Sequence, residues 1–239
     1  MPAGPLKTLL ALDTCGPRCA AAVFEAHGDA LTVRAEDAIP MERGHAEAVV
    51  PMADRVMADA GIDFPGLDCI AVTVGPGSFT GVRIGIAAAR GFALAHVIPM
   101  VGIGVLDAIA ETVRSASPGV REPLAIALDA RRGEVYLQSF ADGGGALDEP
   151  IAIIPGDAVS HIPQGCWRIA GSGAAMIQEA AAPWGRAFSI VSDDAAPSLR
   201  SIARLALNRS GERGPPFPVY LRPPDAKPQT RAVKVICDG

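Results

Sequence analysis

Lys7-Thr-Leu-Leu-Ala-Leu-Asp13 is a short apolar run that ends in a carboxylate, and this pattern is typical of a buried strand. Cys19 to Phe24 follows a Gly-Pro turn and predicts a second strand, so the two segments form a hairpin with Asp13 at its lip. The pattern recurs at Leu124 to Asp129, where the turn Ala-Arg-Arg-Gly leads into Glu134 to Phe140. The two hairpins match at one constant offset, which indicates two related lobes.

Strands and helices alternate along the rest of the chain. Apolar runs predict further strands at Leu31 to Ala38, Cys69 to Val74 and Trp167 to Ala170. Apolar residues at helical spacing predict helices at Gly44 to Ala60, Val82 to Ala95, Gly173 to Ala182 and Ser198 to Arg209. Pro51 should kink the first of these helices or mark its true first turn. Six prolines should keep the chain extended from Pro215 to Pro228.

The composition is that of a folded globular protein. Of 239 residues, 49% are hydrophobic and 20% are charged, which excludes a disordered chain, and the length fits one large domain or two small lobes. The formal net charge of −5 provides no broad basic field for nucleic acid. We therefore expect any contact with RNA to be local or to be made by a partner.

The cysteines and the apolar runs favour a cytoplasmic protein. Five cysteines are an odd number and none form a C-x-x-C pair, so neither a disulfide framework nor a zinc clamp is indicated. The run Leu9 to Leu12 is too short for a signal peptide, and the stretch Gly91 to Leu106, free of acidic and basic charges, is shorter than a membrane span. We expect no membrane contact.

A glycine-rich loop, Gly75-Pro-Gly-Ser-Phe-Thr-Gly81, lies between a predicted buried strand and a predicted helix. Backbone N–H groups at the start of a helix form a natural anion site, so the loop is a candidate for phosphate binding. The alternative is that its glycines only permit a tight turn, since the loop lacks the lysine of a P-loop and the spacing of a dinucleotide fold. The residues alone favour the tight turn.

The longer stretch Gly75-Pro-Gly-Ser-Phe-Thr-Gly-Val-Arg-Ile-Gly85 resembles the signature of the TsaB (YeaZ) family. Three more stretches agree in order: Leu10-Ala-Leu-Asp-Thr14, Asp129-Ala-Arg-Arg-Gly-Glu-Val-Tyr136 and Pro218-Val-Tyr-Leu-Arg222. The resemblance implies an α/β, two-lobed actin/hexokinase-like (ASKHA) fold with duplicated mixed-sheet lobes. We expect an N-terminal lobe at residues 1–115, and a C-terminal lobe with the closing helix and a Pro-rich basic tail at residues 116–239.

The resemblance also implies a function. It suggests a non-catalytic subunit for N6-threonylcarbamoyladenosine formation in tRNA, at the adenosine beside the anticodon. Its partners would be the catalytic subunit TsaD and the ATPase TsaE. The chain would then have no activity alone and no firmly bound cofactor, ATP would act at the level of the complex, and tRNA would be met only through the complex.

A metallopeptidase is one alternative, because this superfamily was long labelled glycoprotease-like. The catalytic relatives carry two histidines four residues apart on a helix, which places both on one face to bind a metal. Here the corresponding stretch is His45-Ala-Glu-Ala-Val49, so an aliphatic side chain replaces the second ligand. We therefore expect no metal site and place His45 at the surface or at the helix cap.

An independent actin-like ATPase is the other alternative. Such folds place acidic groups around a metal-bound phosphate, and Asp13 and Asp129 are the candidates. Both carboxylates could equally accept backbone N–H bonds in their hairpin turns. If a nucleotide binds this chain, we expect it to contact Asp13, Gly75, Gly77, Ser78, Gly81 and Asp129.

The predicted helix from Val82 to Ala95 has no polar face, since Arg83 and Arg90 are its only charged residues. It is either buried within the monomer or covered by another chain. The resemblance favours a contact with TsaD, or with a second copy in a homodimer, through this helix and that from Gly44 to Ala60. The expected contact residues are Val49, Ala53, Val56, Met57, Ala60, Ile84, Ala87, Ala88, Gly91 and Ala95.

The last forty residues reverse the sign of the chain's charge. They hold eight basic side chains against three acidic ones. This bias is compatible with a local tRNA or partner contact. Few aromatic residues are interleaved with the basic ones, so a solvated helix face followed by a tail is the simpler interpretation.

Overall fold

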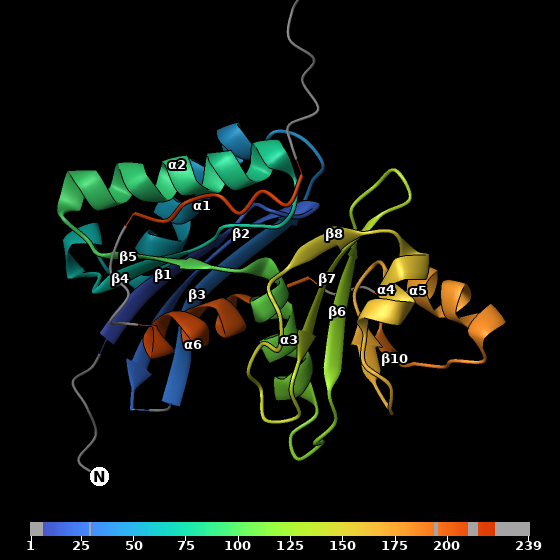
Figure 1. Cartoon of the computed structure of the whole chain (residues 1–239). Helices are drawn as coiled ribbons and strands as arrows, with labels where there is room; N and C mark the ends of the chain where they lie inside the picture. The colour runs from blue at the N-terminus through green and yellow to red at the C-terminus, as the bar shows by residue number, and fades with distance from the viewer. Residues whose placement is uncertain (1–6, 29, 194–195, 210–214, 223–239) are drawn as a thin grey trace, which may run out of the picture.

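The structure is a computed structural model that describes residues 7–28, 30–193, 196–209 and 215–222. Two five-stranded mixed sheets lie side by side, each with helices against its faces (Figure 1). The first half of the chain forms β1 (Lys7–Asp13), β2 (Arg18–His27), β3 (Ala30–Pro40), α1 (His45–Ala60), the 3-10 helix η1 (Phe64–Gly66), β4 (Cys69–Thr73), α2 (Phe79–His96), β5 (Met100–Ile103) and α3 (Val105–Ala116). The second half forms β6 (Leu124–Asp129), β7 (Val135–Phe140), β8 (Ile151–Ile153), α4 (Pro155–His161), β9 (Arg168–Ala170), α5 (Ala174–Ala181), η2 (Ala182–Trp184), β10 (Ser189–Ser192) and α6 (Leu199–Asn208).

The first sheet has the strand order β3-β2-β1-β4-β5. Its central strand β1 pairs antiparallel with β2 and parallel with β4, so that Leu10 lies opposite both Val23 and Ile70. A strand covered on both faces is apolar along its whole length, which explains why β1 lacks alternation. The acidic residue of β1 is at its end, where Asp13 lies opposite Ala20 in the hairpin.

The second sheet repeats this topology. Its order is β10-β9-β6-β7-β8, which is the order of the first sheet when β6 replaces β1 and the following strands are matched in turn. Asp129 ends β6 and lies opposite Val135 of β7, as Asp13 does at the end of β1. The duplicated hairpin and the two-lobed fold class expected from the sequence are both confirmed.

The helix after each sheet packs on the other sheet. Helix α3 contacts β6 and β7, and α6 contacts β1, β2, β4 and β5 (Figure 1). Accordingly Leu106 and Ile109 share a core with Leu124, whereas Ile202 shares a core with Leu9. The lobe boundary after residue 115 stays a prediction, and the contacts add that α6, which follows the second sheet in sequence, packs its buried face on the first sheet.

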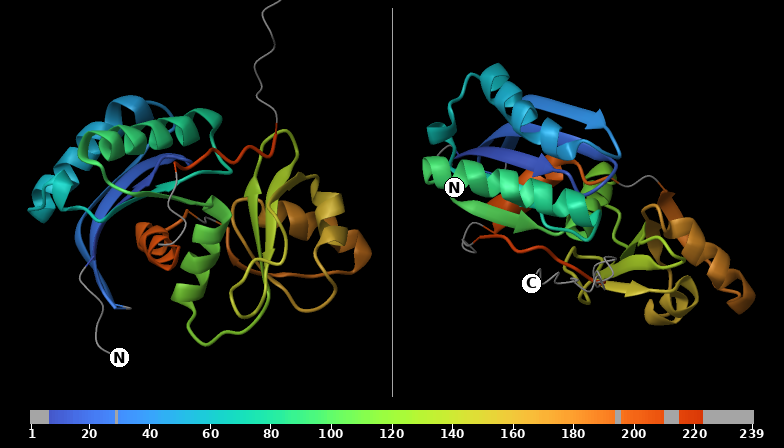
Figure 2. Two further views of the ribbon diagram at one scale, coloured as in Figure 1. Left: turned by 60° about the vertical axis from the view of Figure 1, so that its left-hand side comes forward. Right: turned by 90° about the horizontal axis from the view of Figure 1, so that it is seen from above.

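The remaining helices cover the outer faces of the sheets. Helices α1 and α2 lie together on the face of the first sheet opposite α6 (Figure 2). Helices α4 and α5 contribute Val159 and Ile177 to a core with Ala125 and Leu137 of the second sheet. No helix within the described residues is both long and apolar enough to cross a membrane.

The structure differs from the sequence-based prediction in the start of α2 and settles the place of Pro51 in α1. Helix α2 begins at Phe79 rather than Val82, because the Ser78 side chain caps it by accepting the Gly81 N–H at 3.2 Å. Pro51 lies inside α1 and does not mark its first turn, since the helix already begins at His45.

Residues 215–222, here called the strap, run in an extended course beside α2 and cross toward the second sheet (Figure 1). The Val219 N–H donates to the Val74 carbonyl at 2.8 Å, just beyond β4. At the other end Arg222 forms an ion pair with Glu134 at 2.9 Å and donates to the Ala130 carbonyl in the second hairpin. The expected extended chain is thus confirmed up to Arg222, and its continuation to residue 228 lies outside the described residues.

Candidate functional site

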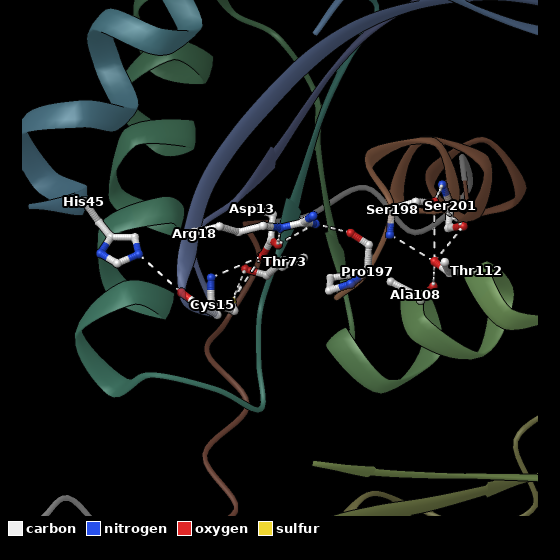
Figure 3. A network of polar contacts seen from close by, with 11 residues as sticks. Asp13, Cys15, Arg18, His45, Thr73, Ala108, Thr112, Pro197, Ser198 and Ser201 are labelled. Carbon is white, nitrogen blue, oxygen red and sulfur yellow. Dashed lines mark hydrogen bonds and ion pairs between the residues drawn. The ribbon is translucent and has the colours of Figure 1, made fainter. Parts of the chain in front are cut away.

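The Asp13 carboxylate is buried and fully engaged by this chain (Figure 3). Its Oδ1 accepts the Thr73 hydroxyl at 2.8 Å and the Cys15 N–H at 3.2 Å, and its Oδ2 accepts two donors of Arg18. Arg18 also donates to the Pro197 carbonyl, directly before α6. A carboxylate paired with a guanidinium has no free oxygen for a cation.

Two buried thiols adjoin this cluster and are held neutral. The Cys15 thiol donates to the Thr73 hydroxyl at 3.1 Å. Burial, and then the Asp13 charge, raises the pKa of Cys15 far above its ordinary value, and the same causes raise the pKa of Cys19 to about 11. A thiol protonated at neutral pH is a poor nucleophile, so the cluster offers no cysteine chemistry.

The glycine-rich loop packs directly on the turn that follows Asp13. A Cβ at Gly77 would lie 2.5 Å from the Cys15 carbonyl oxygen, and a Cβ at Gly81 or Gly85 would overlap the backbone or side chain of Thr14. These glycines are thus required for close approach of two backbones. The turn at Thr14 and Cys15 therefore lies directly against the loop.

Two N–H groups of the loop are also in use. The Ser78 N–H donates to the Cys15 carbonyl at 2.8 Å, and the Gly81 N–H donates to the Ser78 side chain. Gly75 takes a positive φ of 104°, and a Cβ there would lie 2.8 Å from the Val219 carbonyl oxygen of the strap. The geometry of these residues is that of a tight structural turn, the simpler of the two interpretations of the sequence.

Asp129 occupies the equivalent place in the second hairpin. Its Oδ1 accepts the Arg131 N–H at 2.7 Å, two residues ahead, as Asp13 accepts the Cys15 N–H. Its own N–H donates to the Ser172 hydroxyl at 3.0 Å. Each carboxylate is therefore bound within its own hairpin, as the alternative interpretation of the sequence proposed. Arg18, which neutralises Asp13, was not singled out from the sequence, although an arginine five residues after a buried aspartate is the available signal.

His45 opens α1 and is buried, which corrects the expected surface position. Its Nε2 lies 3.3 Å from the Gly16 carbonyl oxygen and so ties α1 to the first hairpin turn (Figure 3). Val49, one turn later, is 1% exposed within the core. Among the residues that the structure describes, no three His, Cys, Asp or Glu side chains form a group suited to a metal ion.

The expected contact residues on α1 need correction. All five of them are buried in the core of the monomer: Val49, Ala53, Val56, Met57 and Ala60. Their helical spacing marks the face that packs on the sheet, and a buried side chain is not available to another protein. The outer face of α1 instead presents Val50, which is 42% exposed, together with Pro51 and Ala58.

The outer face of α2 is exposed and apolar. Ala87, Gly91 and Ala95 are exposed at helical spacing, and a Cβ added at Gly91 would meet no atom within 4 Å. Leu94 is 86% exposed and Val97, at the end of the helix, 90%. Ile84 and Ala88 are only half-buried and pack at the edge of the core. Leu94 and Val97 were missed from the sequence, although Leu94 follows Ala87 by two helical turns.

The strap borders this face on the side away from α1 (Figure 2). Arg83 donates to the Tyr220 hydroxyl at 2.7 Å and lies over the Phe79 ring at 3.7 Å. Arg90 donates to the Pro216 carbonyl at 2.7 Å. Both arginines of α2 are thus held by the strap or its neighbours, and the centre of the helix is left apolar. We call the exposed residues Val50, Ala87, Gly91, Leu94, Ala95 and Val97 the α1/α2 face.

Known proteins resemble this chain along most of its length. The family model described as TsaD, tRNA N6-adenosine threonylcarbamoyltransferase, matches residues 39–193. An uncharacterized protein of Mycobacterium tuberculosis is 34% identical over 93% of this chain and 95% of that protein. The tRNA threonylcarbamoyladenosine biosynthesis protein TsaB of Escherichia coli is 33% identical over 55% of this chain and 54% of that protein.

Solved structures extend the likeness to the whole fold. The structure of YeaZ from Pseudomonas aeruginosa superposes with a TM-score of 0.70 and 30% identity, over 90% of this chain and 100% of that chain. Because this likeness spans the complete YeaZ chain, the protein belongs to the TsaB (YeaZ) family.

Proposed function

We propose that this chain is a non-catalytic partner subunit in the formation of N6-threonylcarbamoyladenosine in tRNA, beside the anticodon. The TsaB relatives from Escherichia coli and Haemophilus influenzae are named for the biosynthesis of this nucleoside. In this proposal the chain docks onto the catalytic subunit TsaD in the cytoplasm, and the ATPase TsaE joins the pair.

The α1/α2 face carries the proposal. Its small residues let a second helix approach closely, and Leu94 and Val97 provide exposed apolar anchors. A soluble protein rarely leaves such side chains together in solvent without a binding role. The same face would also support pairing of two copies when TsaD is absent.

The sealed hairpin favours a role without chemistry. Asp13 is neutralised by Arg18, and the glycine-rich loop is packed against Thr14. These contacts support the proposal that ATP acts at the level of the complex. With a net charge of −5, the chain is expected to meet tRNA through the other subunits.

Co-purification tests the proposal directly. The full chain, carrying an affinity tag, is expected to retain the TsaD of its own genome, and the pair should restore threonylcarbamoyladenosine in tRNA of cells depleted of their own TsaB, as read by mass spectrometry of nucleosides. A chain that neither retains TsaD nor restores the modification would overturn the proposal.

A further inference from the structure

An apolar groove of about 410 Å³ lies at the carboxyl end of α1. Its lining consists mainly of Met57, Ala58, Gly61, Ile62 and Phe64. The wall at Phe64 is fixed by ring stacking on two residues of α2, Phe92 at 4.7 Å and His96 at 5.3 Å between centroids. The groove therefore lies beside the carboxyl end of α2.

Two carboxylates complete the lining of the groove. Asp54 and Asp63 are both exposed and both line it. Within the described part of the chain neither side chain has an ion pair or a hydrogen bond, and Asp63 precedes η1 without capping it. The groove thus joins an apolar floor to two uncompensated negative charges.

The backbone adds to the same potential. The carboxyl end of α1 carries the negative pole of the helix, and the last turn contains no basic residue that would offset it. Carboxylates near such a helix end are unfavourable for the isolated chain. Arg55, the basic residue of α1, is paired with Asp37 of β3 at 2.7 Å.

We propose that this groove receives an arginine side chain from the partner subunit, with its aliphatic stem on Ala58 and Ile62 and its guanidinium between Asp54 and Asp63. Arginine fits better than lysine because a planar fork can serve two separated carboxylates and costs less to dehydrate. The apolar floor of the groove also favours a long side chain with an aliphatic stem over a bound metal ion. This inference rests on the proposed docking of TsaD.

Titration calorimetry with purified TsaD of the same genome tests the docked complex. The double variant Asp54→Asn/Asp63→Asn should bind about tenfold more weakly than the parent, with a smaller dependence on salt. Asp59→Asn removes an exposed carboxylate of α1 that does not line the groove, and it should bind like the parent. Equal binding by all three proteins, or equal weakening by both variants, would overturn the inference.

A small probe tests the groove without TsaD. N-acetyl-arginine methylamide should shift the NMR signals of the Ala58 and Ile62 methyl groups in the parent chain, and the double variant should lose this response. N-acetyl-norleucine methylamide, which has a similar stem and no charge, is the control. Equal shifts with both probes, or none with the arginine probe, would overturn the groove assignment. If the parent binds the arginine probe but not TsaD, the proposed function fails and the groove stands.

Discussion

Arg18 donates from Nε and Nη2 to the same Asp13 oxygen, with both nitrogen to oxygen distances at 3.1 Å. The guanidinium therefore neutralises a carboxylate that is 1% exposed at the lip of the first hairpin. A cation could bind the Asp13 carboxylate only by displacing Arg18. The position that an actin-like enzyme would use for metal-bound phosphate is a structural ion pair in this protein.

Replacement of Arg18 should destabilise the folded protein. Arg18→Ala leaves the buried Asp13 charge without its partner, and we expect the free energy of unfolding to fall by about 2 kcal/mol, allowing for the partial exposure of Arg18. Urea denaturation measures the change. Arg34→Ala, which breaks the exposed pair with Glu25, is the matched control and should cost less than about 1 kcal/mol. Equal losses in the two variants would contradict the buried ion pair.

Two glycines of α2 should respond to alanine in opposite directions. Gly81→Ala places a Cβ onto the Thr14 carbonyl oxygen, and we expect a loss of at least about 3 kcal/mol in the free energy of unfolding. Gly91→Ala meets open space in the same helix and should stabilise the protein by roughly 0.5 to 1 kcal/mol through helix propensity. Thermal unfolding of both variants decides the matter, and a stable Gly81→Ala protein would refute the close packing of the loop.

A large cation at Gly91 should block docking. Gly91→Arg puts an unpaired charge and excess volume into a close helix contact, and we expect the affinity for TsaD to fall at least about a hundredfold. Gly156→Arg is the control, because Gly156 is also exposed with no neighbour within 4 Å but lies on α4 of the other lobe. Both variants should melt like the parent. Ala88→Arg is a poorer test, since Ala88 packs against the core and its replacement should also destabilise the monomer. Unchanged binding by Gly91→Arg would remove α2 from the interface.

The buried thiols should resist alkylation. With its pKa raised to about 11, Cys19 is a thiolate in only about one molecule in a thousand at pH 8. Cys166 is exposed and should react with iodoacetamide before Cys15 and Cys19. Mass spectrometry should show Cys15 and Cys19 unmodified until denaturant is added. Any slow labelling of Cys19 in the native protein should rise about tenfold per pH unit below pH 11. Labelling of Cys19 as fast as that of Cys166 would contradict the burial.

The hairpins and the long helices could be predicted because their patterns extend over enough residues. β1 and β6 are uninterrupted apolar runs with a terminal carboxylate, and α1 shows helical spacing over its full length. β5, β8 and β10 span three or four residues each, which is too short for a period to emerge. Helix α3 was not predicted, because its first residues, Val105 and Leu106, continue the uncharged stretch that begins at Gly91 and so hide where the helix starts.

The candidate site was predicted less well than the fold, for a physical reason. Periodic apolar residues such as Val56 report the face that packs on the sheet, so they identify the core and not a surface for another protein. Exposed apolar residues such as Leu94 are recognised only when the buried face is known. The role of Arg18 likewise depends on a turn geometry that brings it back to Asp13.

Helix α3 packs on the second sheet and α6 packs on the first, and this arrangement affects co-translational folding and the stability of fragments of the chain. The first sheet receives its cover on one face from α6, which is almost the last described segment to leave the ribosome. Neither half of the chain contains a complete core, so co-translational folding cannot finish lobe by lobe. A fragment that stops after α3 would expose Leu9 and Ala11 of β1 to solvent, and the two lobes should unfold as one cooperative unit.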